Sequence, residues 1–132
     1  MIRTPIIAVL CALAATLAAG PAAAAPLPKY VGQCALTRVK RVETRLEDGV
    51  THVPIEGSGS AVEFVNGGYQ VSYDNVAAVE RSHPGDRVKM CLVAIPRHCP
   101  PGDARGRRYR TTNLRTHQSW TLDDSEHGCG GA

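Results

Sequence analysis

Cysteine and histidine are the residues of this sequence whose types and spacing could do chemistry. After position 25 the cysteines are Cys34, Cys91, Cys99 and Cys129, and His98 and His127 lie beside the last two. Two imidazoles and two thiolates could bind zinc, but zinc sites usually contain closely spaced Cys-x2-4-Cys pairs. An even number of cysteines in an oxidising compartment instead predicts two disulfide bonds, with no metal site and no cofactor.

Four cysteines allow three disulfide connectivities, and the spacing does not decide among them. We favour Cys34–Cys91 together with Cys99–Cys129. A bond between Cys91 and Cys99 would bring their Cα atoms within about 7 Å, so residues 92–98 would have to fold back sharply.

A second group of candidate residues is rich in arginine. It comprises Arg97, Arg105, Arg107, Arg108, Arg110 and Arg115. Asp103 is the only acidic residue between positions 97 and 115. Because a guanidinium group forms paired hydrogen bonds with phosphate or carboxylate, this segment is a candidate binding site for an acidic protein surface or an anionic component of the cell envelope. Alternatively, these arginines form the solvated outer face of a strand.

The histidines suggest an alternative function. They are His52, His83, His98, His117 and His127. Two of them could provide acid–base catalysis in a small secreted hydrolase, with arginines stabilising negative charge. Their spacing brings no pair together, so the sequence favours a non-enzymatic binding or inhibitor-like protein and assigns no catalytic residue.

Residues 1–24 are typical of a removable signal peptide. Arg3 provides the positive start, residues 6–19 are continuously apolar, and the alanines at 22–25 suit signal peptidase. The apolar stretch is shorter than the about 20 residues of a membrane-spanning helix. We therefore predict a single mature domain of residues 25–132, periplasmic or secreted, without a membrane span. Loss of Arg3 leaves 14 of the 15 lysines and arginines against 12 acidic residues, which does not predict a nucleic-acid partner.

Glycine and proline divide the mature chain into short apolar runs, as is typical of all-β domains. Residues 34–46 are rich in Val and Thr and predict a strand with an irregularity near Lys40 and Arg41, although a helical spacing of apolar residues also fits. The other predicted elements are a helix at 74–82, a turn at 83–86, a central strand at 87–95, a long loop at 97–108 and a hairpin of 109–114 with 119–122. Asp74 is the predicted N-cap of the helix, and Trp120 is a predicted core residue.

The clearest element is a hairpin of residues 61–65 and 68–73. Its central Asn-Gly pair favours a two-residue type I′ turn. Such a turn would pair Phe64 with Tyr69, and Glu63 would face Gln70 on the polar side of the hairpin.

These patterns predict a mainly β fold, a small antiparallel sheet or partial barrel with one short helix, stabilised by disulfides. The C-terminal region contains CLVxxPxxCPxGDxRG at 91–106, TNLRT at 112–116, Trp120 and HxCGGA at 127–132. In these residues, and in the 58–73 hairpin, the chain resembles a group of small exported bacterial proteins. The resemblance implies export and no particular activity.

Overall fold

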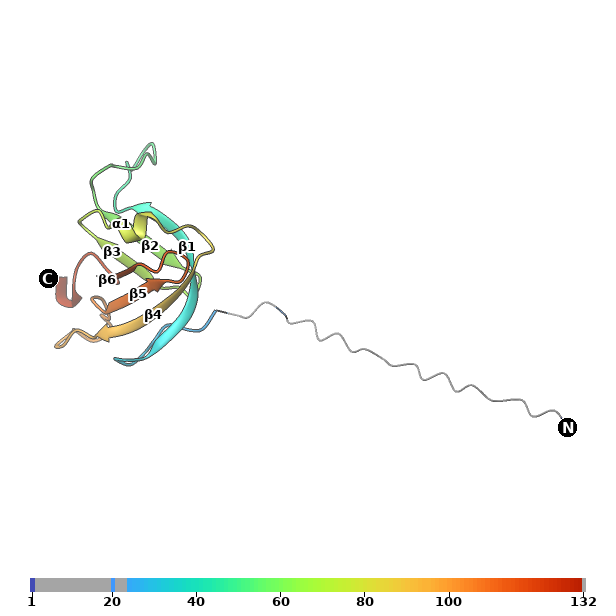
Figure 1. Cartoon of the computed structure of the whole chain (residues 1–132). Coiled ribbons are helices and arrows are strands. Elements are labelled where there is room, and N and C mark those ends of the chain that lie inside the picture. The colour runs from blue at the N-terminus through green and yellow to red at the C-terminus, as the bar shows by residue number, and fades with distance from the viewer. Residues whose placement is uncertain (2–19, 21–23, 132) are drawn as a thin grey trace.

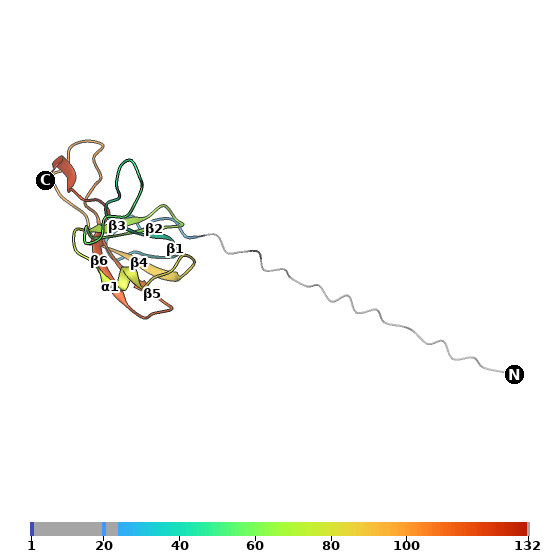
Figure 2. The same ribbon diagram turned by 90° about the horizontal axis from the view of Figure 1, so that it is seen from above.

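The structure, a computed structural model, describes Met1, Gly20 and residues 24–131, so most of the predicted leader lies outside the described residues. In chain order the elements are β1 (Cys34–Thr44), β2 (Ser60–Phe64), β3 (Tyr69–Ser72), α1 (Ala77–Glu80), β4 (Arg87–Ala94), β5 (Arg108–Asn113), β6 (Ser119–Asp123) and a short 3-10 turn, η1 (Cys129–Gly131). The strands close into a barrel in the order β1-β2-β3-β6-β5-β4 (Figures 1 and 2).

The barrel consists of two antiparallel three-stranded meanders. Strands β1, β2 and β3 form one, and β4, β5 and β6 form the other. The β1–β4 pair and the shorter β3–β6 pair join them. The predicted mainly β fold with one short helix is confirmed, and its sheet is a closed barrel. Among the described residues, no helix combines the length and the apolar composition needed to cross a bilayer.

Large apolar side chains that alternate along the strands fill the barrel. On β4, Val88, Met90 and Leu92 are fully buried, and the residues between them face outward. Strand β4 pairs with both β1 and β5, but every strand of the closed barrel has two neighbours, so the predicted distinction of a central strand does not arise. Phe64 and Trp120 lie in the same core cluster, so the prediction for Trp120 is also confirmed.

Strand β1 contains the predicted irregularity. Val39 pairs with Phe64 and Arg41 pairs with Glu63, so Lys40 is an extra residue on β1. One extra residue is a β-bulge, which increases the local bend and twist of a strand. The segment is therefore a bulged strand, and the helical alternative is excluded.

The predicted register of the β2–β3 hairpin is wrong by one residue. Glu63 pairs with Tyr69, and Val62 pairs with Gln70. Because side chains alternate between the two faces of a strand, a shift of one residue moves Gln70 from the expected polar side into the barrel. Gln70 is fully buried there.

The cause of this shift is the turn. The Phe64 N–H donates a hydrogen bond to the Gly68 oxygen at 2.9 Å, which encloses a three-residue loop instead of the predicted two-residue turn. Gly67 has a φ of 85°, as expected when a left-handed residue follows a type I turn. A Cβ at Gly68 would lie 3.0 Å from side-chain atoms of Leu27 and Met90, so the chain passes close to the core here.

Gln70 connects three strands inside the barrel. Its Nε2 donates to the Tyr109 oxygen at 2.8 Å and to the Leu122 oxygen at 3.1 Å. Its Oε1 accepts hydrogen bonds from Thr111 Oγ1 at 2.7 Å and Trp120 Nε1 at 2.9 Å. Four hydrogen bonds satisfy the amide, which is why a polar side chain is tolerated at this depth.

Helix α1 packs against β1, β2 and β6. It is shorter than predicted, and its N-cap is Val76 without a side-chain hydrogen bond, so the prediction of Asp74 as N-cap is wrong. The Val76 N–H is instead bound by Ser60 Oγ at 2.8 Å. Val79 is fully buried in the core cluster and Val76 packs against it. The predicted turn before β4 is present, because the Asp86 N–H donates to the His83 oxygen.

Residues 45–59 project from the barrel between β1 and β2 (Figures 1 and 2). The Asp48 N–H donates to the Val53 oxygen, so the loop folds back on itself. The Asp48 carboxylate also accepts hydrogen bonds from the N–H groups of Val50 and Thr51 at 2.9 and 2.7 Å. The loop is therefore ordered by its own hydrogen bonds.

Candidate functional site

The four cysteines after position 25 form the two disulfides that we favoured from the sequence. Cys34 and Cys91 are register partners on β1 and β4, with their Cα atoms 4.0 Å apart. Cys99 is bonded to Cys129, with a Cα–Cα distance of 5.3 Å. Sulfur in a disulfide is not a thiolate ligand, so the zinc site considered from the sequence does not form in this state.

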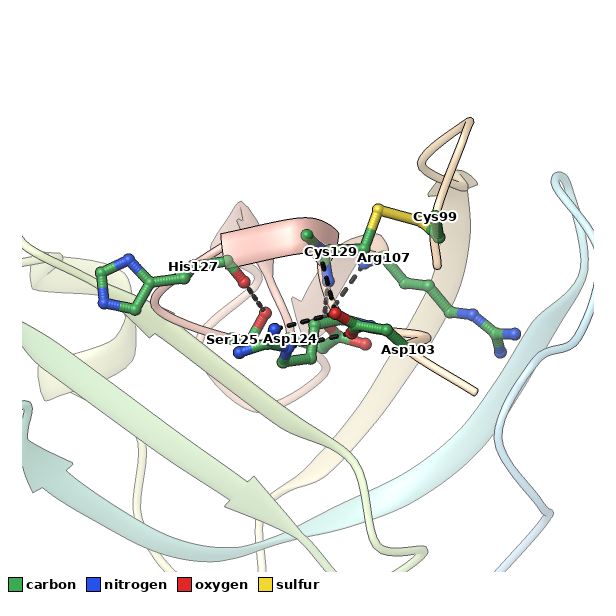
Figure 3. The surroundings of a disulfide bond; sticks show 10 residues. Cys99, Asp103, Arg107, Asp124, Ser125, His127 and Cys129 are labelled. Carbon is green, nitrogen blue, oxygen red and sulfur yellow. Dashed lines mark hydrogen bonds and ion pairs between the residues drawn. A yellow bond between two sulfur atoms is a disulfide. The ribbon is translucent and has the colours of Figure 1, made fainter. Parts of the chain in front are cut away.

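The second disulfide fastens the long loop after β4 to the C-terminal segment (Figure 3). Asp103 in this loop accepts hydrogen bonds from Arg105 Nε and Nη2 at 2.9 and 2.8 Å, and from the Gly130 N–H at 3.0 Å. Arg105 above all, and then Gly130, hold the pKa of Asp103 below its ordinary value. Asp124 accepts a hydrogen bond from the Gly106 N–H at 2.8 Å. The carboxylates here therefore organise the loop.

The six predicted arginines differ in their partners. Three are bound to carboxylates, in the pairs Arg105–Asp103, Arg108–Asp123 and Arg115–Asp86. Within the described part of the chain, Arg97, Arg107 and Arg110 have no ion pair. Arg97 is exposed in the loop after β4, whereas Arg110 projects from the outer side of β5.

The Asp86–Arg115 pair is the most extensively bonded of the three. The nearly buried Asp86 carboxylate accepts hydrogen bonds from Arg115 Nε and Nη2 at 2.7 and 2.9 Å. The His83 N–H and Asn113 Nδ2 each donate to it at 2.8 Å. These donors, Arg115 above all, hold the pKa of Asp86 well below its ordinary value, although burial opposes them. Arg115 thus joins the β5–β6 turn to the turn before β4.

A different set of basic residues lies on the outer surface of β1, β4 and β5, and we call it the basic face. It comprises Arg38, Arg87, Lys89 and Arg110. All four are exposed and alternate with buried residues, so they project from the same side of the sheet. Arg38 and Arg87 are register partners, and Arg110 is the register partner of Cys91. Side chains opposite each other in antiparallel strands have Cβ atoms about 5 Å apart.

The segments of β1, β4 and β5 that carry the basic face contain no carboxylate, because Glu43 of β1 lies beyond the bulge, where it pairs with Arg41. Residues 34–40, 87–94 and 108–113 contain neither Asp nor Glu. Arg38 is oriented by a hydrogen bond from its Nη1 to the Gly85 oxygen at 2.9 Å, which leaves its charge uncompensated. Because like charges directly opposite each other destabilise a sheet, the Arg38–Arg87 pair is unfavourable for folding. A cationic surface of this kind is suited to binding an anion from outside.

Sequence analysis identified Arg110 and missed the other three members of the basic face. A signal was present, because each strand contains two basic residues two positions apart. The pairs are Arg38 with Lys40, Arg87 with Lys89 and Arg108 with Arg110. Residues at this spacing share one side of a strand. This spacing does not indicate that β1, β4 and β5 are neighbours in the barrel.

The five histidines are exposed, and each lies in a different loop, turn or terminal segment. His52 contacts Glu47 through Nδ1 at 3.0 Å in the projecting loop. Among the described residues, no group of three His, Cys, Asp or Glu side chains could hold a metal ion. The histidines thus come from separate segments, although the Cys99–Cys129 disulfide joins the two segments that contain His98 and His127.

Among the described residues, two open hollows are lined by residues that do not belong to the basic face. The larger, of about 620 Å³, is lined by Arg41, Glu43, Arg45, Glu47, Pro54 and Glu80 among others. The smaller, of about 300 Å³, is lined by Tyr73, Arg108, Asp123 and Glu126 among others. Neither is lined by histidine or cysteine. Ion pairs already engage Arg41, Arg45 and Arg108, so these hollows have less free charge than the basic face.

Comparison of the chain with known protein families, with curated protein sequences and with solved structures finds no match. The basic face, the two disulfides and the two hollows are therefore the features from which a function can be inferred.

Proposed function

We propose that the protein is an exported, non-enzymatic binding protein of the cell envelope, periplasmic or secreted, whose basic face binds an anionic partner. The proposal is carried by four exposed cations on three neighbouring strands whose paired segments contain no acidic residue. The two disulfides support export, because such bonds persist mainly outside the reducing cytoplasm.

The strands hold these cations at fixed spacings before any partner arrives. Arg87 and Lys89 are two positions apart on β4, which corresponds to about 7 Å along a strand. Arg38 and Arg110 lie on the two neighbouring strands, each about 4.8 Å away from β4. The Cys34–Cys91 disulfide crosslinks β1 to β4 within the same surface. Because the strand backbones are already ordered, binding costs conformational entropy only in the side chains, which favours affinity.

Binding is better supported than catalysis. An enzyme needs a nucleophile or a general base held beside a substrate site. Here the histidines are dispersed over separate segments, and the hollows contain arginines that are bound to carboxylates of the protein itself. The basic face needs neither a cavity nor an acid–base pair in order to bind an anionic surface.

Heparin, used as a soluble polyanion, provides a direct test with the purified, disulfide-bonded protein. We expect Arg87→Gln with Lys89→Gln to weaken heparin binding by about tenfold and to lower its salt dependence by about two ionic contacts. The matched control is Arg97→Gln with Arg105→Gln, which removes the same net charge from the loop after β4. We expect the control to retain most of the affinity.

The opposite ranking of these two variants would move the binding site to the loop after β4 and overturn the assignment of the basic face. Absence of salt-sensitive heparin binding by the native protein would overturn the proposed function itself.

A further inference from the structure

Exposed apolar side chains lie within and beside the basic face. They are Tyr30, Val31, Leu36, Val93 and Ile95, with exposed fractions of 71, 60, 51, 39 and 41%. We call this set the apolar edge. Large apolar side chains gathered beside a charged surface, rather than scattered singly, are typical of interaction sites.

Backbone pairing places the apolar edge next to the basic face. Leu36 is the register partner of Lys89, so it lies within the outer surface of β1 and β4. The segment before β1 continues along β4, because the Gly32 N–H donates to the Leu92 oxygen at 2.8 Å and the Leu92 N–H donates to the Gln33 oxygen at 3.0 Å. The turn that contains Tyr30 and Val31 is thereby held against the end of β4.

We propose that the basic face and the apolar edge together dock the protein on the surface of an anionic lipid bilayer. This inference rests on the proposed function and specifies its partner. The cations contact the phosphate groups of the lipids, and the apolar edge enters the boundary between headgroups and acyl chains. Peripheral membrane binding generally combines these two contributions, basic charge and shallow apolar insertion.

The composition of the surface favours a lipid over other anionic partners. A soluble polysaccharide offers no apolar phase for Val31, Leu36 and Val93. Single-stranded nucleic acid is usually bound on stacked aromatic side chains, and Tyr30 is the one aromatic residue in this surface. Tyrosine is instead enriched where a bilayer meets water, because its ring is apolar and its hydroxyl is polar. A bilayer supplies both the anions and the apolar phase.

The projecting 45–59 loop has the opposite electrostatic character. Val50 and Val53 are exposed there as well, at 88 and 58%. Glu47, Asp48 and Glu56 surround them in the sequence, and an anionic bilayer would repel these carboxylates. The loop therefore provides a control with similar apolar exposure and unsuitable charge.

Co-sedimentation with vesicles tests the inference on the disulfide-bonded protein. One set of vesicles contains equal parts of phosphatidylglycerol and phosphatidylcholine, and the other contains phosphatidylcholine alone. We expect binding to the anionic vesicles only, reduced at least tenfold when salt is raised from about 0.15 M to about 1 M. Arg87→Gln with Lys89→Gln should weaken vesicle binding by about fivefold for each charge removed.

Apolar substitutions separate lipid docking from simple anion binding. We expect Val31→Ser with Leu36→Ser to lower the affinity for anionic vesicles by about tenfold and to leave heparin binding unchanged. The matched control, Val50→Ser with Val53→Ser, should alter neither. An unchanged near-ultraviolet circular dichroism spectrum shows that the substituted protein is folded.

Failure of the inference differs from failure of the proposed function. If the protein binds heparin but not anionic vesicles, or if the Val31 and Leu36 substitutions leave vesicle binding unchanged, the partner is a soluble polyanion or an acidic protein and lipid docking is wrong. If the protein binds neither heparin nor anionic vesicles, both proposals are wrong. Equal binding to phosphatidylcholine alone would overturn the role of the basic face in docking.

Discussion

Two groups of basic residues in this protein differ in what surrounds them. Arg105, Arg108 and Arg115 each bind a carboxylate of the protein. Within the part of the chain that the structure describes, the cations of the basic face have no such partner, and two of them, Arg38 and Arg87, lie opposite each other. The first group stabilises loops and strand ends, whereas the second reduces stability and is available to a ligand. The ion-pair partner of an arginine, more than its position in an arginine-rich segment, therefore indicates what it does.

The two groups are also held in place differently. A covalent bond between Cys34 and Cys91 joins the strands of the basic face, where the charges repel. Around Cys99 and Cys129 a disulfide acts together with the Asp103–Arg105 pair.

Removal of the Cys34–Cys91 disulfide should have the largest effect. The two cysteines are separated by 57 positions, and a loop of that size corresponds to about 4 kcal/mol of stabilisation through the unfolded state. We expect Cys34→Ser with Cys91→Ser to lower the free energy of unfolding by about this amount, measured by urea denaturation. An unchanged urea midpoint would show that hydrogen bonding alone holds β1 to β4.

Loss of a paired carboxylate should destabilise the protein, whereas loss of an unpaired cation should not. Asp86→Ala removes four hydrogen bonds and leaves the buried Asn113 amide short of a partner. We expect a loss of about 2–4 kcal/mol in the free energy of unfolding. The comparison variant on the basic face is Lys89→Ala. It should change the free energy of unfolding by less than about 0.5 kcal/mol. Equal losses would contradict the distinction between the two groups.

Acid should remove the stabilising contribution of the Asp86–Arg115 pair and leave the basic face unaffected. The folded-state pKa of Asp86 lies below its ordinary value, so its contribution to stability is complete above that value and is lost as the pH falls through about 4 and below. The ionisation of Asp86 should therefore change the urea midpoint little between pH 7 and pH 5. Once the pH is lower than about 4, the urea midpoint should decrease. Asp86→Asn should make that fall shallower. If the urea midpoint of the Asp86→Asn protein decreased as steeply with pH as that of the native protein, other carboxylates would control the acid sensitivity.

The smallest predicted effect is a gain in stability. Arg87→Gln removes one of two like charges that face each other across β1 and β4. We expect the free energy of unfolding to rise by about 0.2–0.5 kcal/mol, with the gain fading at high salt. A loss of stability would mean that the Arg87 side chain has a structural partner.

The fold was largely predictable because alternation and turn residues report on each strand separately. The bulge near Lys40 and the core position of Trp120 both followed from local patterns. The register of the β2–β3 hairpin did not, since Asn66-Gly67 fits both a two-residue and a three-residue turn. The turn that forms determines whether Gln70 is buried. The hydrogen-bond partners of Gln70 lie on β5 and β6, about 40 residues or more further along the chain.

The candidate site was less predictable than the fold. The arginine-rich segment was visible in the sequence, but the acids that bind Arg108 and Arg115 lie at Asp123 and Asp86, outside that segment. The basic face depends on the β1–β4 pairing, which joins residues about 50 positions apart. The density of charge along the sequence does not show which arginines bind a carboxylate. It also does not show that the basic residues of β1, β4 and β5 lie side by side.

Mapping of heparin binding by NMR tests the central claim most directly. Backbone amide shifts of the disulfide-bonded protein, followed during a heparin titration, report which strands contact the polyanion. We predict the largest shifts on the paired segments of β1, β4 and β5, around Arg38, Lys89 and Arg110, with small shifts around Arg105. Shifts concentrated in the loop after β4, with none on these three strands, would contradict the assignment of binding to the basic face.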